Sequence, residues 1–131
     1  MTNHEVPAEI LVVDDNPAMV RLLAEVLEDE GYRVATVEGG EVVELALAAP
    51  PRLILLDVMM PGLDGPEVCR RLRADPRTQA VPIVLVTALP PATLAVQLRG
   101  CPYDELLPKP FAIEAVLAIA ERYAGPPMTP A

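Results

Sequence analysis

Polar residues stand where the short apolar runs of this chain end, and their side chains combine three acids, a hydroxyl and an amine. Asp14 and Asp15 end the first such run, Asp57 the third, Thr87 the fourth and Lys109 the fifth. Crowded carboxylates repel one another and ionise fully only where a cation joins them. Mg²⁺, a hard cation that takes oxygen ligands and keeps several waters, suits such a group.

These residue types together suit chemistry on a phosphoryl group. Mg²⁺ neutralises the charge that develops on a phosphoryl group during transfer. The Lys109 amine can contact a phosphoryl oxygen as a point charge, and the Thr87 hydroxyl can donate a hydrogen bond to another. A carboxylate can itself be the nucleophile, which yields an aspartyl phosphate.

Five β-α units in about 125 residues are needed to position these groups. The predicted strands cover residues 10–13, 33–37, 53–56, 83–86 and 105–107, and the predicted helices cover 17–30, 41–49, 64–74, 92–99 and 112–123. Strands that are apolar throughout are buried on both faces, which indicates a parallel sheet between two layers of helices. The sequence therefore predicts a doubly wound α/β fold, whose functional groups gather at the carboxyl ends of the strands.

Local signals fix several helix ends and faces. Asn16 is a good N-cap and Pro17 a good first helical residue. Gly31 stands where the end of that helix needs a left-handed residue. In the last helix, Ile113, Val116, Leu117 and Ala120 recur at the spacing of a core-facing stripe.

Composition narrows the class of protein. The net charge is −9, which argues against direct binding of nucleic acid. No signal peptide is indicated, and no apolar run reaches the roughly 20 residues of a membrane helix. Cys69, expected to be half-buried, and Cys101, expected in a loop, have no metal-ligand spacing, so free thiols in the cytoplasm are expected.

The segments ILVVDDNP, LILLDVMMPGLDG and IVLVTA, followed by Lys109-Pro110-Phe111, resemble in order and spacing the CheY-like receiver domain of bacterial two-component response regulators. The resemblance covers about residues 8–124. It leaves 1–7 as an N-terminal extension and 125–131 as a Pro-rich tail or the start of a linker. It implies a flavodoxin-like five-stranded parallel sheet in the order 2-1-3-4-5.

The resemblance also implies roles. Asp57 would accept a phosphoryl group from a phosphohistidine of a sensor histidine kinase or a phosphotransfer protein. Asp14, Asp15, Asp57 and the backbone carbonyl of Met59 would hold Mg²⁺. Thr87 and Lys109 would bind the phosphoryl group, with a cis bond between Lys109 and Pro110. The protein would then be a phosphorylation switch and not a turnover enzyme.

Three positions depart from the family pattern. Leu106 stands where the family usually has an aromatic residue that rotates with the switch, and Tyr103 is near but out of register. Pro108 removes a backbone donor from the fifth strand. Residues 90–91, both proline, shorten or stiffen the fourth helix, which belongs to the family's usual output surface.

Three other functions compete. A haloacid-dehalogenase-type phosphatase needs a second acid two residues after its nucleophile, where this chain has Met59. A flavodoxin-like FMN binder needs a hydroxyl- and Gly-rich loop after the first strand, where this chain has Asp14 and Asp15. A degenerate receiver, which binds partners without phosphorylation, is disfavoured by the complete acid set and favoured by Leu106.

The resemblance implies partners as well. These are the kinase, a downstream effector or output domain, and a second copy of the chain. The family's docking surface is built from the fourth helix, the fifth strand and the fifth helix. No output domain is recognisable in the sequence, so both a stand-alone receiver and a piece of a larger regulator fit it.

Overall fold

The computed structural model describes residues 8–37, 41–58 and 64–127. Strands and helices alternate along these ranges. The strands are β1 (Ile10–Val13), β2 (Val34–Val37), β3 (Leu53–Asp57), β4 (Ile83–Thr87) and β5 (Glu105–Pro108). The helices are α1 (Pro17–Asp29), α2 (Val42–Ala48), α3 (Gly65–Ala74), α4 (Pro91–Gln97) and α5 (Ile113–Ala124).

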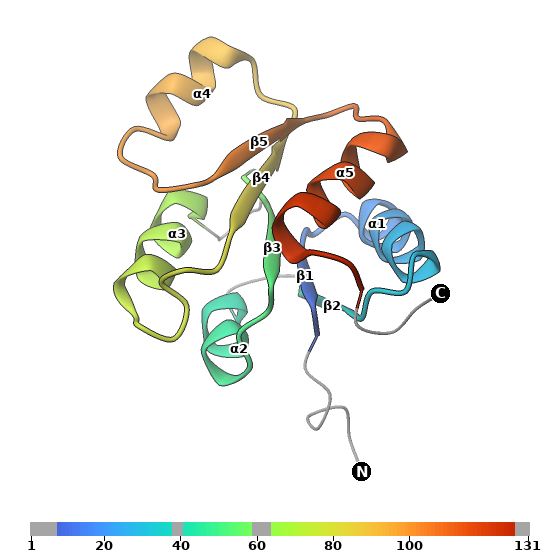
Figure 1. Cartoon of the computed structure of the whole chain (residues 1–131). Coiled ribbons are helices and arrows are strands. Elements are labelled where there is room, and N and C mark those ends of the chain that lie inside the picture. The colour runs from blue at the N-terminus through green and yellow to red at the C-terminus, as the bar shows by residue number, and fades with distance from the viewer. Residues whose placement is uncertain (1–7, 38–40, 59–63, 128–131) are drawn as a thin grey trace.

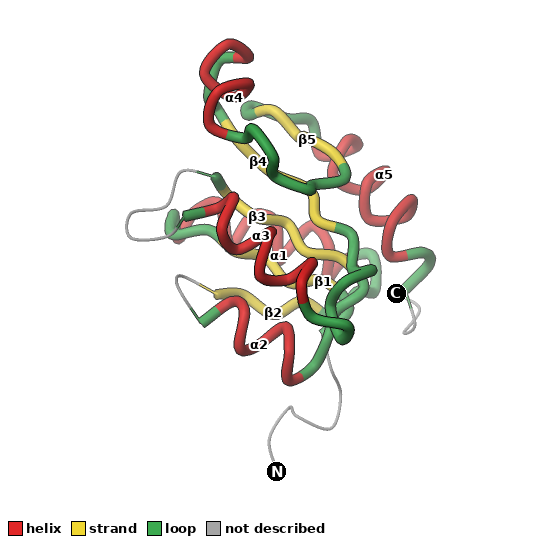
Figure 2. The backbone as a smooth tube through the Cα atoms, turned by 90° about the vertical axis from the view of Figure 1, so that its left-hand side faces the viewer, coloured by secondary structure: helices red, strands yellow, loops and turns green. Residues whose placement is uncertain are grey.

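The five strands form one parallel sheet in the order β2-β1-β3-β4-β5, which Figure 2 shows as a stack. Val13, at the end of β1, is in register with Leu56 of β3. Asp57 is in register with Val86, and Thr87 with Pro108. The carboxyl ends of the strands therefore meet at one edge, and the predicted doubly wound fold and strand order are confirmed.

Helices cover both faces of the sheet (Figure 1). On one face α1 and α5 pack over alternate strand residues such as Ile10, Val12 and Val84. On the other face α2 and α3 pack over the intervening residues such as Leu11 and Ile83. β1, β3 and β4 are buried along their whole length, as continuously apolar central strands of a parallel sheet should be.

The predicted signals at α1 are confirmed. The Asn16 side chain accepts hydrogen bonds from the backbone N–H groups of Ala18 and Met19, and Pro17 begins the helix. Gly31 has a φ of 103°, a left-handed conformation that a residue with a Cβ rarely adopts. The Asn16 cap therefore begins α1 directly after the acids that follow β1.

Other local predictions were wrong or need adjustment. Ile113 is not a core residue: it is 46% exposed, whereas Val116 and Ala120 of the same helix are buried. Ile113 is the first residue of α5, and apolar spacing cannot show where the sheet beneath a helix ends. Pro108 is the last residue of β5, and the N–H of Lys109 donates to the Thr87 carbonyl just beyond it.

The helix after β4 is short. Pro90 is its N-cap and no side chain caps its first turn; it spans seven residues, against thirteen in α1. In the described ranges, no helix has the length and apolar character needed to cross a membrane.

Candidate functional site

Three carboxylates meet at the carboxyl edge of the sheet. Asp14 and Asp15 follow β1 directly, and Asp57 is the last residue of the neighbouring β3. One oxygen from each lies within 4.8 Å of the others. Asp14 and Asp57 are only 2% and 6% exposed, whereas Asp15 faces solvent. The group therefore combines two buried acids with one through which solvent or an ion can enter.

Lys109 brings a positive charge to this group. Its Nζ lies 3.3 Å from Asp14 Oδ2 and 3.5 Å from Asp57 Oδ2. The backbone of Lys109 is fixed by its N–H, which donates to the Thr87 carbonyl at 2.7 Å. The bond between Lys109 and Pro110 is cis, as expected from the sequence. The lysine is thus held where it contacts two acids at once.

Thr87 ends β4 at the same edge of the sheet, next to β3 and its Asp57. Its side chain is 1% exposed, and its Oγ1 accepts a hydrogen bond from the N–H of Leu89 at 3.0 Å. The hydroxyl hydrogen remains available for donation, because the Leu89 contact uses the oxygen only as an acceptor. Thr87 therefore offers a hydrogen-bond donor at the same edge of the sheet as the acids.

A cavity of about 430 Å³ lies beneath α4, and Thr87 is part of its wall. Its walls are mostly apolar and come from α4, β5 and the loops around them. Besides Thr87 they comprise Leu89, Leu94, Ala95, Leu98, Tyr103, Leu106 and Pro108. Leu106, which stands where the family usually has an aromatic residue, therefore lines the same cavity as Thr87 and the α4 residue Leu94.

Asp14, Asp15 and Asp57 are called the acid group below. The charge and donor types of this group suit a divalent cation. One lysine against three carboxylates leaves two formal negative charges. All three acids offer oxygen, the ligand type that Mg²⁺ prefers. Asp14 Oδ1 also accepts a hydrogen bond from the N–H of Asn16 at 2.9 Å, which holds its carboxylate in place. The residues present therefore fit Mg²⁺.

The structure thus brings together Asp14, Asp15, Asp57 and Lys109, and places Thr87 at the same edge. Met59, whose carbonyl was expected to complete the metal ligands, lies outside the described residues. Sequence reasoning missed the backbone contact from Asn16 to Asp14, because the geometry of a strand-to-helix turn leaves no signal in residue types.

Another buried acid shows what a structural carboxylate looks like in this fold. Glu9 is 1% exposed and precedes β1, at the opposite end of the strand from Asp14. It accepts hydrogen bonds from the N–H of Arg33 at 2.9 Å and from Arg52 Nη1 at 3.0 Å. Glu9 joins β1 to the segments that lead into β2 and β3, whereas the acids at the carboxyl edge crowd one another.

Comparison with known families gives a match over most of the chain. Residues 10–121 match the family model of the response regulator receiver domain. This range contains all the residues of the acid group together with Thr87 and Lys109.

Relatives and a solved structure agree with the family match. The response regulator PleD of Caulobacter vibrioides is 56% identical over 84 residues, which are 63% of this chain and 18% of PleD. The DNA-binding dual master transcriptional regulator RpaA of Synechocystis is 42% identical over 110 residues, 83% of this chain and 46% of RpaA. The chain thus spans less than half the length of these relatives.

The solved structure is the receiver domain of the sensor histidine kinase PA1611 from Pseudomonas aeruginosa. It superposes with a TM-score of 0.84 at 31% identity, covering 92% of this chain and 99% of that one. That crystal structure has a magnesium ion coordinated in its active-site cleft.

Proposed function

The chain belongs to the response regulator receiver domain family of two-component systems, and from that membership we propose that Asp57 is the residue that accepts the phosphoryl group. In this step a carboxylate oxygen of Asp57 attacks phosphorus, and the bond from phosphorus to the donor breaks. With a histidine kinase or a phosphotransfer protein as donor, the imidazole nitrogen leaves with the bonding electrons. The product is an aspartyl phosphate.

The contact between Lys109 and the acids carries this proposal. Lys109 Nζ lies 3.5 Å from Asp57 Oδ2, so it can follow the charge onto a phosphoryl group placed on that carboxylate. Thr87 can donate its hydroxyl to another phosphoryl oxygen. When Thr87 turns toward the phosphate, the Leu89 N–H loses its acceptor, and the loop leading to α4 must adjust.

Mg²⁺ is the proposed cofactor, held by Asp14, Asp15 and Asp57, with the Met59 carbonyl as the further protein ligand. When bound, it neutralises charge on the transferring phosphoryl group. Asp14 and Asp15 serve to orient the ion, because Asp57 must leave one oxygen for phosphorus. Support comes from the all-oxygen donor set and from the magnesium in the PA1611 receiver domain.

The proposed activity is that of a switch and not of a turnover enzyme. Residue 59 is Met, so the position two residues after Asp57 offers no acid to protonate a leaving group. The proposed cellular place is the cytoplasm, where the kinase and the output partner would be met. We also propose residues 8–124 as the receiver domain, flanked by an extension at 1–7 and a Pro-rich segment at 125–131.

The proposed docking face for an effector, an output domain or a second copy consists of α4, β5 and α5. Val96 on α4 is 66% exposed and Ile113 on α5 is 46% exposed, which gives the face apolar contact points. Arg122 and Glu105 form an ion pair between α5 and β5 at 2.6 Å. With a net charge of −9 over its 131 residues, the chain is not proposed to bind nucleic acid itself.

The test is phosphate uptake from a small phosphodonor, such as acetyl phosphate, followed by intact-mass measurement. We expect one added phosphate in the presence of Mg²⁺ and none after chelation. Asp57→Asn removes the nucleophile and keeps the shape, so it should take up none, whereas Asp64→Asn, which changes the exposed N-cap of α3, should behave as wild type.

The alternative is a degenerate receiver that binds partners without phosphorylation. The observation that favours it is Leu106, which lines the cavity beside Thr87 where the family usually has an aromatic residue. If wild type takes up phosphate neither from small donors nor from a histidine kinase, this alternative is correct.

A further inference from the structure

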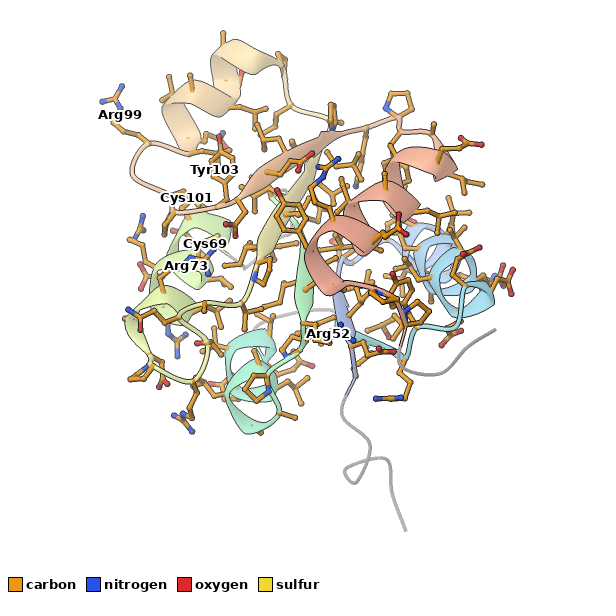
Figure 3. All side chains as sticks on the ribbon, viewed as in Figure 1. Arg52, Cys69, Arg73, Arg99, Cys101 and Tyr103 are labelled. Atoms are coloured by element: carbon orange, nitrogen blue, oxygen red, sulfur yellow. The ribbon has the colours of Figure 1, made fainter. Side chains whose placement is uncertain are left out.

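The two cysteines of the chain lie together, on parts of the chain that carry none of the three acids. Cys69 is on α3 and Cys101 is in the loop between α4 and β5. Both belong to the same buried cluster, and each thiol is near enough to shift the pKa of the other. Figure 3 shows them next to each other, one on the helix and the other on the loop above it. The expectation of a half-buried Cys69 was wrong, since it is fully buried.

Arg73 holds the Cys101 loop against α3. It lies one helical turn after Cys69, and its Nε donates to the carbonyl of Pro102 at 3.0 Å. Its Nη2 pairs with Asp104 at 2.6 Å, and Asp104 in turn accepts from the N–H of Ile83 at 2.8 Å. The two thiols are therefore kept side by side by polar contacts on the chain immediately around them.

The two thiols differ in access. Cys101 is 9% exposed, whereas Cys69 has no exposed surface. Burial raises the pKa of both thiols, and their mutual interaction raises the pKa of Cys69 further while it lowers that of Cys101. The charges of Arg70 and Arg73 oppose this rise, but the pKa of each thiol stays above its usual value because burial is the larger effect. Cys101 is thus the thiol that an external reagent reaches first, and Cys69 the one that can follow.

We propose that Cys69 and Cys101 form a reversible disulfide when the protein meets a low-molecular-weight disulfide, so that oxidation links α3 covalently to the loop before β5. Transient disulfides of this kind serve as redox sensors in reducing compartments. The proposal does not depend on phosphorylation of Asp57.

The reaction is a double thiol–disulfide exchange. Cys101 loses its proton to solvent, and its thiolate attacks one sulfur of the small disulfide; that S–S bond breaks, and one small thiol leaves and takes up a proton. Cys69 then gives up its proton and its thiolate attacks the Cys101 sulfur; the mixed S–S bond breaks, and the second small thiol leaves and takes up a proton. Two protein thiols are oxidised, and one small disulfide is reduced to two thiols.

The disulfide would restrain the wall of the cavity beneath α4. Cys101 lies between Leu98 and Tyr103, which both line that cavity. The N–H of Cys101 donates to the Leu98 carbonyl, and its own carbonyl accepts from the N–H of Tyr103. A covalent link from Cys101 to α3 would therefore fix the C-terminal end of α4 and the entry to β5.

The test uses the whole chain in buffers of graded glutathione disulfide and glutathione. After acid quenching and alkylation, intact mass counts free thiols and peptide mapping identifies the linked peptides. We expect the native protein to lose both thiols without retaining glutathione, with one linked pair that contains Cys69 and Cys101. The same chain in concentrated urea should react faster with glutathione disulfide. To form the internal disulfide, however, it should require about tenfold more glutathione disulfide relative to glutathione than the native protein does.

Matched variants test the order of attack. Cys69→Ala should stop at one glutathione on Cys101, and Cys101→Ala should stay almost unmodified while folded, because Cys69 is inaccessible. The wild-type peptide map does not depend on whether these variants fold. The proposal is overturned if the native wild-type protein keeps both thiols free in a buffer in which the unfolded chain forms the internal disulfide. It is also overturned if the native protein retains glutathione on either cysteine, or if its disulfide joins two molecules.

Discussion

At the scale of single residues, Lys109 sets the charge balance of the three acids. Its ammonium contacts Asp14 and Asp57 at once, so it partly offsets the repulsion among the three acids. A bound Mg²⁺ would occupy the same surroundings, and two positive groups so close repel each other. Lys109 is therefore expected to weaken metal binding while it favours the phosphorylated state.

Lys109→Met separates these two effects. We expect Mg²⁺ to bind the variant about threefold to tenfold more tightly by calorimetric titration, a gain of roughly 1 kcal/mol. We expect phosphate uptake from a small donor to slow by at least about tenfold, because the charge on the phosphoryl group loses a partner. Lys109→Arg, which keeps the charge, is the control. Weaker Mg²⁺ binding by Lys109→Met would show that the lysine supports the metal site, against our account.

Residue types predicted most of the acid group but not its local contacts. Asp14, Asp15, Asp57, Thr87 and Lys109 each end an apolar run, and strand ends of a parallel sheet share one edge. The thiol pair could not be predicted in this way, because it joins a helix to a loop, and no periodicity fixes where a loop lies.

At the scale of elements, β5 presents two adjacent leucines to opposite faces. Leu106 lines the cavity beneath α4, and Leu107 is buried in the core formed with α1 and α5. Leu106 borders the cavity, whereas Leu107 is packed in the core, so the same enlargement should have opposite effects at the two positions.

Leu106→Phe should stabilise the protein by up to about 1 kcal/mol, because the ring fills apolar space. Leu107→Phe should destabilise it by about 1–3 kcal/mol through overpacking. Urea denaturation measures both free energies of unfolding. A loss of more than about 1 kcal/mol in Leu106→Phe would mean that the cavity cannot accept a ring.

The link between β5 and α5 should depend on pH. Hydrogen bonds lower the pKa of Glu105 below its usual value. The hydrogen bond from Tyr123 has the larger effect, and the one from Arg122 adds to it. A carboxyl whose pKa is lower in the folded state contributes stability above its unfolded pKa and loses it as pH falls through the folded pKa.

We therefore expect wild type to be more stable than Glu105→Gln at neutral pH, by no more than about 1 kcal/mol because Glu105 is partly exposed to solvent. The difference should shrink as pH falls below about 4. Urea denaturation of both proteins over this pH range measures it. A difference that stays constant with pH would show that the Glu105 charge contributes nothing.

The elements themselves followed from the sequence to within a few residues. The five apolar runs became the five strands, and Asn16, Pro17 and Gly31 marked the ends of α1. The prediction that Ile113 faces the core was wrong. Its spacing fits the core stripe, but it lies at the start of α5, where it is exposed. Helix periodicity identifies a face but not how far the sheet extends beneath it.

At the scale of the whole molecule, the crowded acids connect metal binding to folding. Asp14 and Asp57 are buried next to Asp15, so the part of their repulsion that Lys109 does not offset opposes the folded state until a metal ion joins them. An ion that binds only the folded protein stabilises it, by about 2.7 kcal/mol at a hundred times its dissociation constant.

Asp15→Asn tests this connection. Without Mg²⁺ the variant should unfold at a higher temperature than wild type, because one repelling charge is gone. With Mg²⁺ in large excess, wild type should gain several degrees and the variant much less. Asp29→Asn, at the exposed end of α1, is the control and should respond as wild type does. An equal gain in Asp15→Asn and wild type would exclude Asp15 as a metal ligand.

The most direct test of the account is to locate the phosphate chemically. After phosphorylation with a small donor and Mg²⁺, borohydride reduces an aspartyl phosphate to homoserine, and peptide mapping finds the altered residue. We predict homoserine at position 57 and unchanged Asp14 and Asp15. Homoserine at another aspartate, or phosphate on a hydroxyl with Asp57 intact, would contradict the central claim.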